Sequence, residues 1–149
     1  MLKHTGHTQP VPAGLVKLGP LMKVRLSYHP AAAPQLPQPP VTAQMMIDTG
    51  AERTLVEKSI AEQLGLTPIR YDGIIGVSQK AELRPVYLMS VSFTVGGDGQ
   101  AAEVTFATDV VGMESPPKPQ PYVGLLGRDF LMGMRFNYDG PHRFLRADS

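Results

Sequence analysis

The sequence feature that most constrains this chain is the stretch Met45-Met46-Ile47-Asp48-Thr49-Gly50, in which an apolar run ends at one acidic residue. Apolar residues at positions 41, 43, 45 and 47 alternate with Thr42, Gln44 and Met46, which predicts a half-buried strand. Gly50 then permits a sharp turn that a residue with a Cβ atom would resist. We therefore expect Asp48 to lie where a buried strand gives way to a loop, a position at which proteins often hold functional side chains.

The tripeptide Asp-Thr-Gly also has an ordinary explanation. Asp and Gly are turn formers, and average residue usage produces a chance Asp-Thr-Gly in a chain of this length on the order of a few per cent of the time. The tripeptide alone is therefore a weak indication of a site. Its apolar approach strand and a second motif around Gly127 strengthen the interpretation.

Composition narrows the classes of protein to consider. With 149 residues, 42% of them hydrophobic, the chain is long enough for one domain with a core. Its net charge of +1 is spread along the chain, so we expect no nucleic-acid or membrane surface. The absence of Cys excludes disulfides, a thiolate nucleophile and Cys-ligated zinc. No segment resembles a signal peptide or a membrane span, so a cytoplasmic location is expected.

Alternating apolar residues predict several strands. Met22, Val24 and Leu26 indicate one strand after a break at residues 19–20, and alternate positions from Leu83 to Val95 indicate another. A hairpin turn is expected at residues 96–99, followed by a strand over residues 102–106. Because fifteen Gly and fifteen Pro also favour turns over long helices, the sequence predicts an all-β fold.

One short helix is expected soon after the Asp-Thr-Gly turn. Val56, Ile60 and Leu64 fall on one face of a helix and would pack into the core. A capping-box spacing between Ser59 and Glu62 would begin this helix, and a glycine at residue 65 would end it.

Two segments are expected to lie outside the core. Residues 1–13 are polar with two prolines and predict a flexible N-terminal arm. Within it, His4 and His7 have a spacing suited to a metal, but without a third ligand nearby we expect no metal site. Residues 29–40 hold five prolines and three consecutive alanines, which indicates a surface insertion between two paired strands. A ligand for a proline-binding partner is the alternative.

The second motif is Tyr122-Val123-Gly124-Leu125-Leu126-Gly127-Arg128-Asp129-Phe130-Leu131. We expect an apolar strand that ends at Gly127 and a short helix that begins with Arg128 and Asp129. Residues 134–138 and 143–145, on either side of a turn at Asp139-Gly140, then indicate a closing hairpin.

Together the two motifs resemble those of retropepsin-like aspartic proteases, the single-lobed relatives of retroviral proteases. The resemblance rests on Ile47-Asp48-Thr49-Gly50-Ala51 and Leu125-Leu126-Gly127-Arg128-Asp129-Phe130-Leu131 and extends from about residue 41 to residue 131. It implies a closed acid-protease barrel with one or two short helices, in a protease domain over residues 14–149. It also implies that each chain supplies one catalytic Asp, so that the active site exists only in a homodimer.

The chemistry of peptide hydrolysis explains why one Asp is insufficient. A base must deprotonate water while an acid protonates the carbonyl oxygen. Two carboxylates one hydrogen bond apart share a proton, so that each plays one of these roles. This sequence has a single Asp-Thr-Gly and no Asp-Ser-Gly, and a two-fold axis would supply the second carboxylate.

The resemblance assigns roles to residues of both motifs. Asp48 would be the catalytic aspartate, the Thr49 hydroxyl would bond across the dimer, and the Gly50 carbonyl would receive the substrate backbone. Glu52 and Arg128 are expected to form an ion pair near the site. Arg53 departs from the retroviral pattern, which has an acid there, and this bears on substrate preference. Structural support is expected from Ala51, Glu52, Gly127, Arg128 and Asp129.

The resemblance also implies a flap that covers bound peptide, which we expect over Gly73, Ile74, Ile75, Gly76 and Val77. This segment contains glycine and is apolar, as a mobile hairpin lid should be. The expected partners are a second copy of this chain and a peptide substrate, with no cofactor or metal. The dimer interface is expected to include the Asp48 loops and a terminal edge strand at Arg143-Phe144-Leu145.

Two alternatives remain open from the sequence. A retropepsin-like domain could bind peptide or dimerise without useful turnover, since fold does not determine function. A generic β-sandwich with a chance Asp-Thr-Gly is the other alternative, but it does not explain the Gly127-Arg128 segment.

Overall fold

The computed structural model describes residues 6–7, 19–76, 79–97, 100–139 and 144–148. The strands and helices, in chain order, are β1 (Gly6–His7), β2 (Leu21–Tyr28), η1 (Pro30–Ala32), β3 (Val41–Ile47), β4 (Leu55–Glu57), α2 (Lys58–Gln63), β5 (Arg70–Ile75), β6 (Ala81–Gly97), β7 (Gln100–Met113), β8 (Gly124–Leu126), α3 (Arg128–Leu131), β9 (Arg135–Asp139) and β10 (Phe144–Asp148). Strands predominate, as the sequence predicts.

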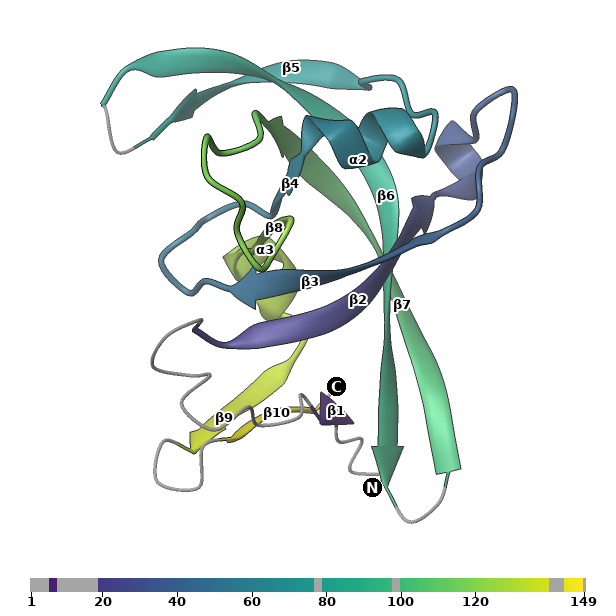
Figure 1. Cartoon of the computed structure of the whole chain (residues 1–149), viewed down its shortest axis with the longest axis vertical. Helices are drawn as coiled ribbons and strands as arrows, with labels where there is room; N and C mark the ends of the chain where they lie inside the picture. Colours follow the sequence, from purple (N-terminus) through teal and green to yellow (C-terminus); the bar gives the residue numbers. More distant parts are fainter. Residues whose placement is uncertain (1–5, 8–18, 77–78, 98–99, 140–143, 149) are drawn as a thin grey trace.

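Six strands close into a barrel in the order β2-β3-β8-β4-β7-β6, with β6 pairing back onto β2 (Figure 1). The β3–β8 and β4–β7 pairs are parallel, and the other pairs of the barrel are antiparallel. Strand β5 adds to the outer edge of β6, and the β5–β6 hairpin extends beyond the barrel. The predicted all-β closed barrel with two short helices is therefore confirmed.

The core lies inside the barrel and follows the predicted alternation. Met22, Val24 and Leu26 of β2 are buried, and Met45 and Ile47 of β3 pack with them. Helix α3 closes one end through an aromatic cluster. The ring of Phe130 meets those of Phe93 and Phe106 edge-on, with centroid distances of 6.2 and 5.3 Å. Such edge-to-face contacts add to the area burial and hold α3 against β6 and β7.

The helix predicted after Asp-Thr-Gly is present as α2, but the start of the helix differs from the prediction. Val56 lies in β4, where the backbone pairs with β7 on one side and β8 on the other. Glu57 precedes the first turn of α2 without a side-chain cap, so the predicted Ser59–Glu62 capping box is wrong. The predicted end is confirmed, because Gly65 has a φ of +71° and its N–H donates to the Glu62 carbonyl. In the described part of the chain, no helix is long and apolar enough to cross a membrane.

A second sheet of order β1-β10-β9 contains the predicted closing hairpin, and its strand β1 lies close to β6 of the barrel (Figure 1). Strand β10 is its middle strand, because Gly6 and His7 of β1 pair with its other side. This pairing reaches only Arg146 and Ala147, so the edge expected at Phe144 and Leu145 stays a prediction, and Arg143 lies outside the described residues. Apart from β1, the predicted arm over residues 1–13 also lies outside them, as do residues 98–99 of the predicted hairpin turn.

Gly124 offers a test of the barrel's packing. A Cβ atom there would lie 2.1 Å from the Leu55 carbonyl oxygen on the neighbouring strand and 2.9 Å from the Met45 Cε atom. Because backbone cannot move aside cheaply, Gly124→Ala should lower the free energy of unfolding by about 1–3 kcal/mol or more, measured by urea denaturation.

The matched control for Gly124→Ala is Gly73→Ala, since a Cβ atom at Gly73 would meet no atom within 4 Å. The control should unfold within about 0.5 kcal/mol of the wild type. Equal stability of the two variants would contradict the described contact between β8 and β4.

Candidate active site

Asp48 stands directly after β3, at the start of the loop that leads to β4. Its backbone N–H donates to the Leu126 carbonyl at 3.0 Å, which anchors the start of the loop to β8. Its Oδ1 atom accepts hydrogen bonds from the N–H groups of Gly50 at 2.9 Å and Ala51 at 3.2 Å. Among the described residues no protein group donates to Oδ2. The side chain is half-buried, so the loop fixes one carboxylate oxygen and leaves the other available.

Two further backbone bonds fasten the loop to the start of α3. The Arg128 N–H donates to the Ala51 carbonyl at 2.9 Å, and the Asp129 N–H donates to the Glu52 carbonyl at 3.2 Å. The structure thus brings both sequence motifs together, although more than seventy residues separate them. Ala51, Glu52, Arg128 and Asp129 lie in the same hydrogen-bonded junction.

The side chain of Asp129 holds the end of the same loop. Its carboxylate accepts hydrogen bonds from the Thr54 N–H at 3.0 Å and the Thr54 hydroxyl at 2.7 Å. The Thr54 hydroxyl in turn accepts the Gly127 N–H at 3.1 Å. Thr54 is fully buried, so every polar atom of its side chain is used inside the protein. No sequence pattern predicted a role for Thr54, although it lies only four residues after Gly50, at the end of the same loop.

The loop that carries Asp48 approaches residue 127 so closely that only a glycine fits there. A Cβ atom at this position would lie 2.4 Å from both the carbonyl carbon and the carbonyl oxygen of Arg53. Neither backbone atom can shift without moving the loop that carries Asp48. The glycine of the second motif therefore allows the junction to close.

The expected ion pair between Glu52 and Arg128 is wrong. Both residues are described, and the Arg128 Nη1 atom instead donates to the carbonyls of Thr49 at 3.0 Å and Gly50 at 3.1 Å. These carbonyls lie in the tight turn after Asp48, and the Glu52 side chain is exposed to solvent. The Gly50 carbonyl is thus already engaged within the chain, although a carbonyl oxygen can accept a second bond.

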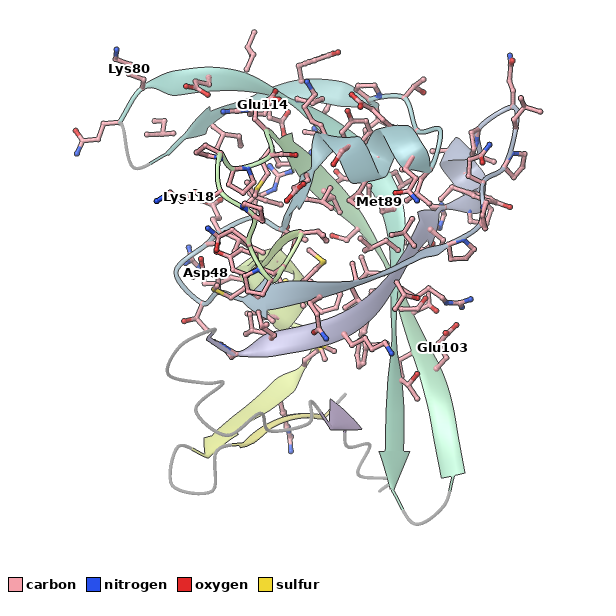
Figure 2. All side chains as sticks on the ribbon, viewed as in Figure 1. Asp48, Lys80, Met89, Glu103, Glu114 and Lys118 are labelled. Atoms are coloured by element: carbon pink, nitrogen blue, oxygen red, sulfur yellow. The ribbon has the colours of Figure 1, made fainter. Side chains whose placement is uncertain are left out.

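The predicted flap coincides with the β5–β6 hairpin. Gly73, Ile74 and Ile75 lie in β5, where Ile75 pairs with Ala81 of β6. The Gln79 N–H donates to the Gly76 carbonyl at 3.0 Å. Val77 lies outside the described residues. Figure 2 shows Asp48 and Lys80, at the end of this hairpin, on the same side of the molecule in that view.

Arg53 connects the Asp48 loop to the hairpin. Its Nη1 atom lies 3.2 Å from the Asp72 carboxylate in β5, and its Nε atom lies 3.8 Å from the Asp129 carboxylate. A hydrogen bond from Arg70 and a weaker contribution from Arg53 lower the pKa of Asp72 below its ordinary value. The sequence marked Arg53 as a departure from the retroviral pattern, but it gave no sign of the partner in β5.

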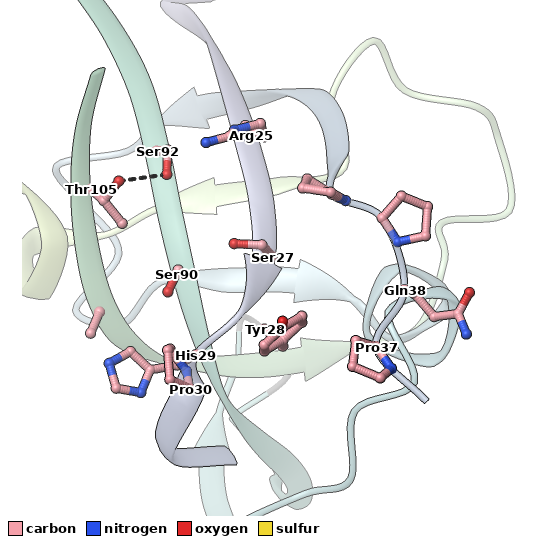
Figure 3. Close-up of a pocket in the computed structure, with 13 residues that line it drawn as sticks. Arg25, Ser27, Tyr28, His29, Pro30, Pro37, Gln38, Ser90, Ser92 and Thr105 are labelled. Carbon is pink, nitrogen blue, oxygen red and sulfur yellow. Dashed lines mark hydrogen bonds between the residues drawn. The ribbon is translucent and has the colours of Figure 1, made fainter. Parts of the chain in front are cut away.

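An open hollow of about 760 Å³ lies elsewhere on the barrel, between β2, β6, β7 and residues 37–40 (Figure 3). Its floor includes Ser92, whose hydroxyl lies 2.8 Å from that of Thr105. None of the predicted site residues lines it. Within the described residues, no three His, Cys, Asp or Glu side chains are grouped to hold a metal ion. The chemistry suggested by the sequence is therefore confined to the Asp48 junction.

Thr54 offers a test of that junction. Thr54→Val keeps the shape of the side chain but removes the hydroxyl, which leaves the buried Gly127 N–H without an acceptor and Asp129 without one donor. We expect this variant to lose about 1–3 kcal/mol of unfolding free energy in urea denaturation. Thr54→Ser keeps the hydroxyl and loses one methyl group, so it should lose only about 1 kcal/mol. A serine variant less stable than the valine variant would contradict the assigned hydrogen bonds.

Comparison with known proteins identifies the family. A family model described as Aspartyl protease matches residues 38–130, which include the first motif, the β5–β6 hairpin and the second motif up to Phe130. No curated protein matches this chain. Among solved structures, a retropepsin-like aspartic protease from Rickettsia conorii has 15% sequence identity and a TM-score of 0.48, over 100% of this chain and 98% of that one. Since the family model covers more than half of the sequence, the chain belongs to the aspartyl protease family.

Proposed function

We propose that this protein is a homodimeric aspartic endopeptidase, in which a water molecule is activated between two Asp48 carboxylates, one from each chain. The observation that carries the proposal is the fixed geometry of Asp48. Its Oδ1 atom is held by two N–H groups of its own loop, and no described protein group donates to Oδ2. Such an arrangement orients a carboxylate while leaving one oxygen for water or for a second carboxylate.

The need for two chains follows from the reaction. Hydrolysis requires an acid and a base at one peptide bond, and this chain contributes one Asp-Thr-Gly. When two carboxylates share a site, like-charge repulsion favours a state with one shared proton, so the pair titrates as a unit. A two-fold axis beside Asp48 would create this pair from identical loops.

The remaining site residues have supporting roles in this proposal. Thr49 is exposed beside Asp48, where its hydroxyl would bond across the two-fold axis. Arg128 holds the carbonyls of Thr49 and Gly50, and therefore fixes the orientation of the turn. Residues 73–77 would cover a bound peptide, with Gly50 receiving part of its backbone. Residues 14–149 would form the protease domain and residues 1–13 an arm, in a protein expected in the cytoplasm.

The second candidate function is a peptide-binding or dimerisation module on the same fold without useful turnover. The engaged Gly50 carbonyl favours this alternative, because a substrate would have to share or displace Arg128. Incubation with an unstructured protein at acidic and neutral pH, with and without pepstatin, separates the two candidates. Peptide binding without cleavage at any pH would favour the module.

Asp48→Asn tests the proposed catalytic role. The asparagine Oδ1 atom can still accept both N–H bonds of the loop, so the fold and the dimer should persist. The variant cannot share an ionisable proton across the site, so cleavage of an unstructured protein, followed by mass spectrometry, should fall at least about a hundredfold.

The matched control is Glu103→Gln, which neutralises a carboxylate that pairs with Arg25 on β2. This control should cleave like the wild type. Cleavage that survives Asp48→Asn in a protein purified free of other proteases would overturn the proposed mechanism.

A further inference from the structure

The β5–β6 hairpin changes character at one cross-strand pair, Asp72 and Arg84. On the barrel side of this pair, Val86 is fully buried. Beyond it, β6 is exposed, with 75% of Leu83 open to solvent, whereas β5 is largely exposed on both sides of the pair, with 62% of Tyr71 and 71% of Ile75 open. The Asp72–Arg84 pair therefore marks the point at which β6 leaves the packed surface of the barrel.

Ion pairs between side chains hold both strands at this point. On β5, Asp72 accepts a hydrogen bond from Arg53 at 3.2 Å, and both side chains are about three-quarters buried, with 25% and 27% exposed. On β6, the Arg84 guanidinium lies 3.9 Å from Glu114, which also pairs with Lys58 of α2 at 3.1 Å. The two contacts lead to different parts of the protein. Of their partners, only Arg53 belongs to the loop that carries Asp48.

Arg53 is itself held in place from the opposite side. Its Nε atom faces the Asp129 carboxylate at 3.8 Å, and Asp129 is fixed by two hydrogen bonds from Thr54. Its guanidinium thus lies between a carboxylate of the Asp48 junction and a carboxylate of the flap strand. A planar guanidinium with several donors suits this bridging position better than a lysine ammonium.

We propose that Arg53 is a positioning residue that sets the hinge of the flap by tying Asp72 to the Asp48 loop. That the hairpin acts as a flap rests on the proposed function, whereas the link between Arg53 and Asp72 rests on the observed contacts alone. With Asp72 held, residues 73–76 and 79–83 form the part of the hairpin that is free to move, and the base of this part keeps a fixed position relative to Asp48. Without this link, β5 depends on its pairing with β6 and on the Arg70 contacts with Asp72 and Asp109.

The link should hold under mildly acidic conditions. Arg70 and Arg53 both face Asp72 and lower its pKa, so this carboxylate stays ionised at pH values where an ordinary Asp begins to protonate. A partly exposed ion pair is also screened by salt, so the link should weaken as ionic strength rises.

The test is hydrogen–deuterium exchange of the β5 amides in Arg53→Gln, Asp72→Asn and the double variant. Partly exposed ion pairs are worth little individually, so each single variant should exchange about two- to fivefold faster over residues 70–75 than the wild type. Because both substitutions break the same contact, the double variant should exchange little faster than Asp72→Asn alone. Arg53→Lys should restore part of the protection.

The matched control is Arg25→Gln, which breaks an exposed ion pair with Glu103 and should leave the exchange of the β5 amides unchanged.

If the enzyme cleaves peptides, Arg53→Gln should raise KM by a similar factor with kcat nearly unchanged, since the hinge acts on capture of substrate. Hydrogen–deuterium exchange requires no turnover, so this experiment tests the Arg53–Asp72 link even if the protein does not cleave peptides. Unchanged exchange in both single variants, or effects that multiply in the double variant, would overturn the inference.

Discussion

The carboxylate of Asp129 holds the loop that carries Asp48 against the start of α3, and the geometry of the site depends on this contact. Its two bonds from Thr54 are 3.0 and 2.7 Å long, and both donors belong to a fully buried threonine, which strengthens them. The loop can approach this closely because residue 127 is a glycine. Backbone atoms of the loop occupy the space that a Cβ atom of residue 127 would need. The second motif therefore acts as the support on which the first motif is folded.

Three aspartates near the site are identical in residue type, but each has a different set of contacts in the structure. Asp48 accepts two N–H bonds from its own loop and keeps one oxygen available. Asp129 accepts three hydrogen bonds, two from Thr54 and one from the N–H of Phe130, which makes it a structural anchor. Asp72 is paired with arginines, which makes it an electrostatic tie between strands and loop. The surroundings of each carboxylate, and not the residue type, separate the candidate catalytic group from its supports.

The sequence predicted the parts of the fold that depend on local patterns. Alternation over residues 41–47 placed Asp48 at the end of a strand, and Gly127 separated a strand from a helix as expected. The failures involve long-range contacts. Val56 has a helical spacing with Ile60 and Leu64, but pairing with two strands draws it into β4. In the same way, the family resemblance paired Arg128 with Glu52, whereas the turn places two backbone carbonyls within reach of Arg128. The partner of Arg53 in β5 depends on how the hairpin folds back, which no local pattern encodes.

The shared active site is tested most directly by mixing wild-type chains with Asp48→Asn chains at constant total concentration, after denaturation and joint refolding. If each site needs two Asp48 carboxylates, activity should follow the square of the wild-type fraction, so that an equal mixture retains about a quarter of the original activity. Activity that falls in direct proportion to the wild-type fraction would show that each chain works alone, and would contradict a site shared between two chains.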